Sequence, residues 1–195
     1  MVAKSNSISE GKRVFLRSPT KKDQTEYLAL NRRSASFNRG LAAPPTQPEE
    51  FLAYLNRSRL DTTACFLICR RADDVIMGSI SASQIFRGGF QSAYLGYHIG
   101  AEFARQGYMT EALALMLRYV FGKLKLHRVE ANIQPGNVAS LALVQRAGFV
   151  KEGFSRRYLK IGGRWRDHER WTLLVEDWEE ISRAKAQRRK ALPRF

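Results

Sequence analysis

The chain has 195 residues, of which 44% are hydrophobic and 26% are charged, and its formal net charge is +15. This composition is typical of one soluble globular domain and excludes a wholly disordered chain. No apolar run reaches the roughly 18 residues that span a bilayer, and residues 1–13 lack the apolar stretch of a signal peptide. We therefore expect a cytoplasmic protein with no membrane contact.

The first predicted elements are a strand over residues 12–19 and a helix that begins at Thr20, and residues 1–11 are expected to form a flexible N-terminus. Thr46 is the expected N-cap of a second helix, because Pro48 follows in its first turn. Three alternating segments come next, at residues 64–70, 75–86 and 91–100. Short turn-forming connectors separate them, so they predict an antiparallel meander.

Cys65 and Cys69 lie in the first strand of this meander. Four residues along a strand place them roughly 13 Å apart, which is too far for a disulfide, so we expect two buried thiols. The chain has no other cysteine, and its three histidines are not clustered. A zinc site would lack ligands, and we expect no metal.

A largely apolar helix is predicted from about Thr110 to Lys123. A strand over residues 127–133 and a helix over residues 135–149 follow it. Asn137 is the expected N-cap of this helix, and Gly148 suits a left-handed residue at its C-terminal end.

A hairpin over residues 150–175 and a helix from Asp177 complete the folded domain, which we place at residues 12–180. Strands and helices mixed in this order predict the α+β class, with helices on the faces of a mixed sheet. Residues 181–195 form a basic tail, which is expected either to contact RNA or the ribosome or to be a solvated end. Its basic residues are Arg183, Lys185, Arg188, Arg189, Lys190 and Arg194.

The segment ARQGYMTEA, residues 104–112, joins a predicted strand to the apolar helix. The first amides of a helix have no partner within it, so a glycine-containing loop at this point can bind an anion such as a phosphate. Gly107 would let the backbone approach the anion, and Arg105 would add positive charge. The alternative is ordinary capping by Thr110 and Glu111.

Several motifs together resemble the GCN5-related N-acetyltransferases (GNAT), in particular the RimJ/RimL branch that modifies ribosomal-protein N-termini. They are GGFQSAYLGYHIG, GYMTEAL, HRVEANIQPGNVAS, RAGFVKEG and GGRWRDH, in this order between residues 12 and 178. The resemblance implies an N-acetyltransferase domain with a GNAT-like mixed, mostly antiparallel sheet, in which a splayed strand pair forms the acetyl-CoA cleft. The family loop has Gln or Arg, then Gly, then Gly or Ala at the positions that hold Ala104, Gly107 and Met109 here, so Gly107 fits this pattern and Ala104 and Met109 depart from it.

The resemblance assigns acetyl-CoA to this loop and to the preceding strand, which would pair with the pantetheine arm. A backbone amide of Ile99 or Gly100 would stabilise the oxyanion. The expected acetyl-CoA residues are Tyr97, Ile99, Gly100, Arg105, Gln106, Gly107, Tyr108, Met109, Thr110 and Asn137.

The family's Asn-x-x-Ser motif corresponds to Asn137 and Ser140. The resemblance implies that Asn137 contacts the pantetheine and that Ser140 serves the thioester sulfur, whereas helix capping alone is the other interpretation.

The general base has no single candidate, because the acidic positions of relatives hold Tyr94 and Leu159 here. The remaining candidates for the base are Glu130, Asp167 and His168. We expect His98 and His127 to be structural. The missing glutamate favours an α-amine, whose pKa is about 7.7 to 8.0, over a lysine, whose pKa is about 10.4.

The leading hypothesis is therefore acetyl transfer from acetyl-CoA to a protein N-terminus, such as that of a ribosomal protein. One rival is the same reaction on a small amine, such as an aminoglycoside or a polyamine. The other is a catalytically weak protein that binds RNA or the ribosome.

Overall fold

The computed structural model describes residues 7–41 and 43–191, with side chains as far as residue 187. Part of the expected N-terminal segment, residues 1–6, lies outside the described residues. Part of the basic tail also lies outside them, namely Arg194 and the side chains of Arg188, Arg189 and Lys190.

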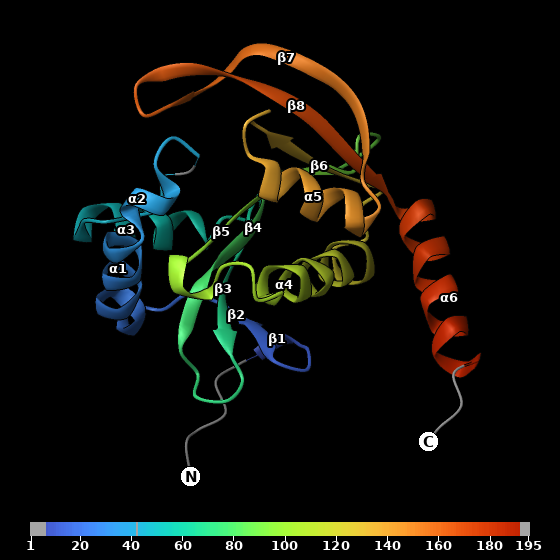
Figure 1. Ribbon diagram of the computed structural model, residues 1–195, viewed down its shortest axis with the longest axis horizontal. Coiled ribbons are helices and arrows are strands. Elements are labelled where there is room, and N and C mark those ends of the chain that lie inside the picture. Colours follow the sequence, from blue (N-terminus) through green and yellow to red (C-terminus); the bar gives the residue numbers. More distant parts are fainter. Residues whose placement is uncertain (1–6, 42, 192–195) are drawn as a thin grey trace.

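An eight-stranded sheet forms the centre of the molecule, in the order β1-β2-β3-β4-β5-β6-β8-β7 (Figure 1). The strands are β1 (Ser7–Glu10), β2 (Val14–Arg17), β3 (Ala64–Arg70), β4 (Ile76–Phe86), β5 (Ser92–Ile99), β6 (Arg128–Ile133), β7 (Val150–Ile161) and β8 (Arg164–Leu174). Neighbouring strands are antiparallel except for β5 and β6, which run parallel. The predicted mixed, mostly antiparallel sheet is confirmed.

Strand β1 corrects the expectation of flexibility for residues 7–10 alone, because Ser9 pairs with Leu16 of β2 and Glu10 pairs with Phe15. The side chain of Ile8 is exposed. No apolar face therefore marks this strand in the sequence, and backbone pairing with the open edge of β2 stabilises it.

Six helices flank the sheet within the described residues. They are α1 (Gln24–Arg33), α2 (Ala35–Asn38), α3 (Pro48–Arg57), α4 (Tyr108–Leu117), α5 (Val138–Ala147) and α6 (Val175–Ala191). A wider turn of π type, Arg118–Lys123, continues α4. None of the helices described is long and apolar enough to cross a membrane.

Helices α1 and α5 cover opposite faces of the sheet. On β5, the His98 ring lies within hydrogen-bond distance of Asn31 of α1, whereas its neighbour Tyr97 contacts Ser140 of α5. Successive side chains of a strand point to opposite faces, so the two helices lie on either side.

Both predicted ends of α5 are confirmed, and the predicted start of α3 shifts by one residue. Asn137 caps α5 as predicted, since its Oδ1 accepts a hydrogen bond from the Ser140 amide at 3.2 Å, and Gly148 ends that helix with a φ of +99°. Helix α3 begins one residue later than predicted: its N-cap is Gln47, because the Glu50 carboxylate accepts hydrogen bonds from the amides of both Thr46 and Gln47.

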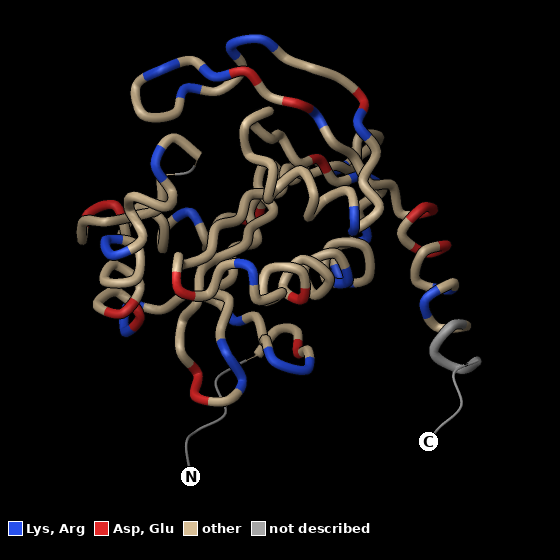
Figure 2. Tube along the Cα trace, viewed as in Figure 1, with Lys and Arg blue, Asp and Glu red and all other residues tan. Residues whose placement is uncertain are grey.

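The C-terminal helix is longer than predicted. Residues 181–191, expected as the start of a tail, belong to α6. Its first turns are attached to the domain, since the Trp178 ring packs 5.3 Å from that of Phe121. Figure 2 shows Lys and Arg on α6 and on the β7–β8 hairpin as well as on other elements, and it also shows Asp and Glu on α6.

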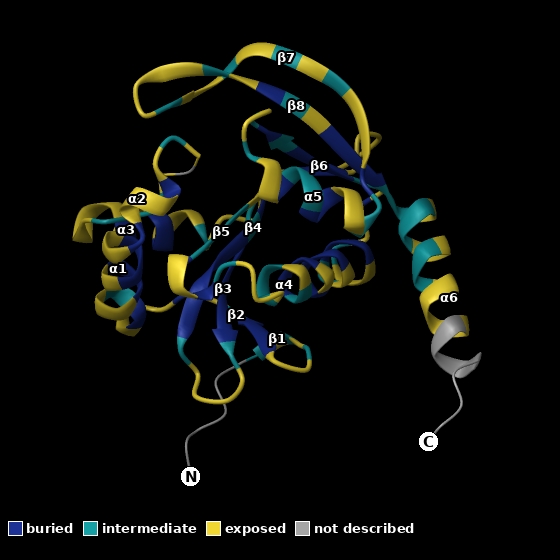
Figure 3. Cartoon of the chain, viewed as in Figure 1, coloured by how far each residue is buried: buried dark blue, intermediate teal, exposed yellow. Residues whose placement is uncertain are grey.

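The core lies between the central strands and the helices, where Figure 3 shows the buried residues in dark blue. Cys65 and Cys69 are both buried and free, as predicted. Burial raises the pKa of the Cys65 thiol to about 11 and that of Cys69 to about 12.

Candidate active site

Strands β5 and β6 pair over only part of their length. Ser92, Ala93 and Tyr94 face Arg128, Val129 and Glu130, respectively. Beyond this point residues 95–99 remain paired with β4 alone, and residues 131–133 with β8 alone. We call the parted segments, residues 95–99 and 131–133, the fork.

The backbone of β5 leaves donors directed into the fork. The Gly100 amide donates to the Met77 carbonyl of β4 at 2.8 Å. Hydrogen bonds alternate along an antiparallel ladder, so the amides of Ile99 and Tyr97 point away from β4, toward the fork. Of the two predicted oxyanion donors, Gly100 is thus already engaged, and the Ile99 amide faces the fork.

The loop after β5 has left-handed backbone conformations at Arg105, with a φ of +61°, and at Gly107, with a φ of +80°. Gly107 is the N-cap of α4, which begins two residues before the predicted Thr110, and no side chain caps it. Among the described residues, none accepts a hydrogen bond from the amides of residues 105–110. These amides are available to an anion.

Glu111 does not cap α4, contrary to the alternative interpretation of the loop. Its carboxylate accepts hydrogen bonds from the amides of Arg13 at 2.8 Å and Val14 at 3.2 Å. Glu111 therefore attaches the β1–β2 turn to α4 and leaves the amides of its own helix unpaired.

Arg13 is a residue of this site that the sequence did not indicate. Its guanidinium donates to the Gln106 carbonyl at 3.1 Å and lies 4.8 Å from the centre of the Tyr108 ring. An ion pair also joins its Nε to the Glu111 carboxylate at 3.4 Å. The side chain is 52% exposed. A cation at the edge of the loop strengthens its attraction for phosphate.

Two hydroxyl groups meet on the α5 side of the fork. The Tyr97 hydroxyl lies 2.5 Å from the Ser140 Oγ. Burial raises the pKa of Tyr97 to about 12, so this hydroxyl stays protonated at neutral pH. Ser140 is 8% exposed and its amide is bonded to Asn137. The structure thus brings together three of the predicted residues.

Glu130 lies where β5 and β6 still pair, opposite Tyr94. Its carboxylate is 2.8 Å from the Nε of Arg128. The same guanidinium also donates to Glu152 and to the Thr172 Oγ1. Glu130 is therefore engaged in an ion-pair network at the closed end of the sheet, outside the fork.

The other two candidate bases lie on β8. The Asp167 Oδ1 accepts a hydrogen bond from the Arg157 amide at 2.7 Å, and the residue is exposed. His168 is 2% exposed, and its Nδ1 lies 3.0 Å from the Arg166 carbonyl. Asp167 is thus the more accessible of the two.

The remaining histidines have structural contacts. The His98 ring lies within hydrogen-bond distance of Asn31 and Ser79, at 3.1 and 3.3 Å, and its burial lowers the pKa to about 4. His127 is exposed and lies 3.3 Å from Glu176.

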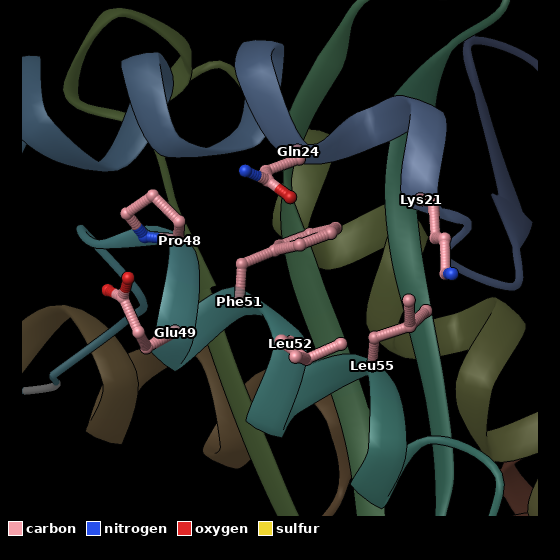
Figure 4. A pocket seen from close by; sticks show the side chains of 7 residues that line it. All are labelled: Lys21, Gln24, Pro48, Glu49, Phe51, Leu52 and Leu55. Carbon is pink, nitrogen blue, oxygen red and sulfur yellow. The ribbon is translucent and has the colours of Figure 1, made fainter.

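Two of the surface hollows formed by the described residues concern the candidate site or its surroundings. The first, of about 460 Å³, is lined by Leu41, residues 134–136, Arg157 and residues 165–167. Its middle segment connects the end of the fork to α5, and we call it the acceptor hollow after the role that we propose for it below. The second, of about 330 Å³, lies between α1 and α3 and includes Phe51 (Figure 4). It contains none of the predicted site residues.

In residues 7–41 and 43–191, no three His, Cys, Asp or Glu side chains are grouped in a way that could hold an ion.

The family model for the acetyltransferase (GNAT) domain matches residues 13–150. A probable N-acetyltransferase of Bacillus subtilis, YjcK, is 34% identical over 179 residues, which cover 88% of this chain and 99% of the relative. The [ribosomal protein uS5]-alanine N-acetyltransferase of Escherichia coli is 43% identical over 103 residues, and this match spans about half of each chain, 53%.

Solved structures show the same architecture. The ribosomal-protein-S5-alanine acetyltransferase of Vibrio fischeri superposes with a TM-score of 0.76 at 25% identity, covering 87% of this chain and 97% of the other. RimJ of Mycobacterium smegmatis in complex with CoA-disulfide gives 0.78 at 23% identity, covering 88% and 89%. The spermidine/spermine N-acetyltransferase SpeG of Vibrio cholerae gives 0.72 at 20% identity, covering 88% and 99%. The last two likenesses concern the fold alone.

Proposed function

We propose that this chain, which belongs to the GNAT family of N-acetyltransferases, transfers acetyl from acetyl-CoA to the N-terminal α-amine of a protein, such as a ribosomal protein. The observation that carries the proposal is the position of the fork, which directly precedes a loop with unpaired amides. Acetyl-CoA is a thioester with a diphosphate and needs both features. The loop amides would bind the diphosphate, and the fork would admit the acetyl group.

The residues present fit acetyl-CoA. Amides of residues 105–110 would bind the diphosphate, with Arg13 and Arg105 adding positive charge. The outward amide of Tyr97 would pair with the pantetheine arm, because it lies on the edge of β5 that has no partner strand. Asn137 would contact the same arm from the start of α5.

The acyl transfer needs an oxyanion donor and a proton for the departing sulfur. In our proposal the amine attacks the thioester carbonyl and the Ile99 amide stabilises the developing oxyanion. Ser140 then donates its proton to the thiolate and regains one through Tyr97, which is reprotonated from solvent, while the amine loses its proton to water. The Tyr97–Ser140 contact supports this path, since two linked hydroxyls can pass a proton in one direction.

The candidate bases of the site favour an α-amine as the acceptor, because an α-amine needs little help to lose its proton. Glu130 is engaged by Arg128, and Asp167 is an exposed carboxylate. At pH 7.5 an α-amine of pKa about 8 is roughly a quarter neutral, whereas a lysine amine of pKa about 10.4 is almost wholly protonated. The α-amine therefore reacts without a strong base, and the ribosomal-protein enzymes among the relatives agree with this acceptor.

The exposed basic surface would assist encounters with RNA-rich partners. Arg183 and Lys185 are exposed on α6, and further Lys and Arg lie on the β7–β8 hairpin (Figure 2). We propose that they attract the ribosome by long-range electrostatics. Such an attraction weakens as salt concentration rises.

The test is an acetylation assay with three acceptor classes at equal concentration: peptides with a free N-terminus and no lysine, peptides with a blocked N-terminus and one lysine, and spermidine. Mass spectrometry identifies the acetylated amine. The proposal expects product from the free N-terminus alone. Acetylation of spermidine or lysine in preference to the α-amine would refute it, and so would an absence of all products from a protein that binds acetyl-CoA.

A further inference from the structure

The acceptor hollow has a chemical character that bears on which N-termini are used. Its middle segment, residues 134–136, follows the last residue of β6 and precedes Asn137. Ser140 lies one turn further along α5. In our proposal, a peptide whose amine reaches the thioester beside Ser140 from this side places its next residues in the hollow.

Positive charge dominates the hairpin that forms one wall of the hollow. Residues 150–174 contain seven Lys or Arg and three Asp or Glu. Two of the acids are paired outside the hollow, Glu152 with Arg128 and Glu169 with Lys151. The only acidic residue that lines it is Asp167, and one of its oxygens is bonded to the Arg157 amide.

Arg166 has an unused donor beside this hollow. Its Nε is buried, and no described residue accepts a hydrogen bond from it. A buried guanidinium N–H without an acceptor is costly, and a carboxylate is the acceptor that best matches its charge. Arg157 lines the same hollow and adds a second positive charge.

Apolar side chains border the hollow as well. Trp165 is 60% exposed and Leu41 is 39% exposed. Large exposed apolar side chains at a polar hollow are typical of peptide-binding surfaces, because they cover the peptide backbone without selecting its charge.

We propose that the acceptor hollow binds the residues that follow the acceptor amine, and that Arg166, with Arg157, selects N-termini that have an acidic side chain within these residues. This inference rests on the proposed function. A polyamine would find two arginines and one partly engaged carboxylate there, so the hollow disfavours a polycation.

The experiment uses peptides that begin with Ala and differ only in a single Glu, Gln or Lys at position 2, 3 or 4. At one of these positions we expect the kcat/KM for Glu to exceed that for Lys by about tenfold, with Gln between them. Arg166→Gln should remove this preference and leave the KM for acetyl-CoA unchanged. The control is Arg164→Gln, since Arg164 is exposed on the same strand and does not line the hollow.

A charge-reversal variant distinguishes a loss of selectivity from a loss of folding. Arg166→Glu should make the Lys peptide the better substrate, which a nonspecific loss of structure cannot do. Acetylation of all peptides at equal rates by the unmodified chain would overturn the inference and leave the proposed function standing. Acetylation of spermidine but of no peptide would overturn both.

Discussion

The Tyr97 hydroxyl lies 2.5 Å from the Ser140 Oγ and links strand β5 to helix α5 on one side of the fork. Both groups belong to positions expected to serve the coenzyme or the reaction, but their direct contact depends on how the helix packs on the sheet. In the proposed mechanism, this hydroxyl pair supplies the proton for the departing thiolate.

The first prediction concerns this pair. Ser140→Ala should lower kcat by about 10- to 100-fold, because the leaving thiolate loses its proton donor, and should change the affinity for acetyl-CoA much less. Tyr97→Phe should lower kcat as well, and the double variant should be no slower than the slower single variant, since both act on one proton path. Steady-state kinetics measure kcat, and calorimetric titration measures the affinity for acetyl-CoA.

The control for this pair is Tyr119→Phe, at the turn after α4, which should leave kcat unchanged. An unchanged kcat in Ser140→Ala would show that Ser140 takes no part in the reaction.

The second prediction concerns Arg13. Arg13→Gln should raise the KM for acetyl-CoA by about tenfold and leave kcat nearly unchanged, because the side chain contacts the Gln106 carbonyl and contributes charge to the loop. The increase in KM should shrink at high salt. Lys12→Gln, one residue earlier and exposed, serves as the control. Equal effects of the two substitutions would show that only net charge matters.

The third prediction separates backbone conformation from charge. Gly107 has a φ of +80°, and a Cβ there would lie 3.1 Å from the Arg13 guanidinium, so Gly107→Ala should cost about 1 kcal/mol of folding free energy and weaken acetyl-CoA binding. Gly122→Ala adds its Cβ in open space at an unstrained position. Thermal unfolding and calorimetric titration compare the two. Full coenzyme affinity in Gly107→Ala would argue against the loop as the binding site.

The fourth prediction follows from the low pKa of His98, which burial brings to about 4 from an ordinary value of 6.5. The unfolded chain binds this proton at a higher pH than the folded chain does. The free energy of unfolding should therefore fall as the pH is lowered from about 6.5 toward 4, by about 2 kcal/mol near pH 5.

Urea unfolding of the unmodified chain and of His98→Asn tests the fourth prediction. The variant should lose about 2 kcal/mol less than the unmodified chain between pH 7.5 and 5. His127→Asn, at an exposed histidine beside Glu176, should keep the original slope. A slope that does not change in His98→Asn would show that another group titrates.

Much of the fold could be predicted because its signals are local. Alternating strands, the apolar helix at α4 and the cap formed by Asn137 each depend on neighbouring residues. Strand β1 escaped prediction because Ile8 is exposed and only backbone pairing marks the strand.

The segments of the candidate site could be indicated from the sequence, but its contacts could not. The loop around Gly107 became a candidate because of its glycine and its place before a helix. Arg13 was not, because 98 residues separate it from Glu111 and only the packing of the β1–β2 turn on α4 brings them together. The choice between Ile99 and Gly100 likewise required the pairing register of β4 and β5.

The central claim is that unpaired loop amides bind the diphosphate and direct the thioester to the fork. An amide-detected NMR titration of the ¹⁵N-labelled chain with acetyl-CoA tests it most directly, because each amide reports separately. We predict saturable shifts at micromolar ligand, largest for residues 105–110 and for Tyr97 and Ile99. Shifts confined to other parts of the chain, or no saturation in this concentration range, would contradict the account.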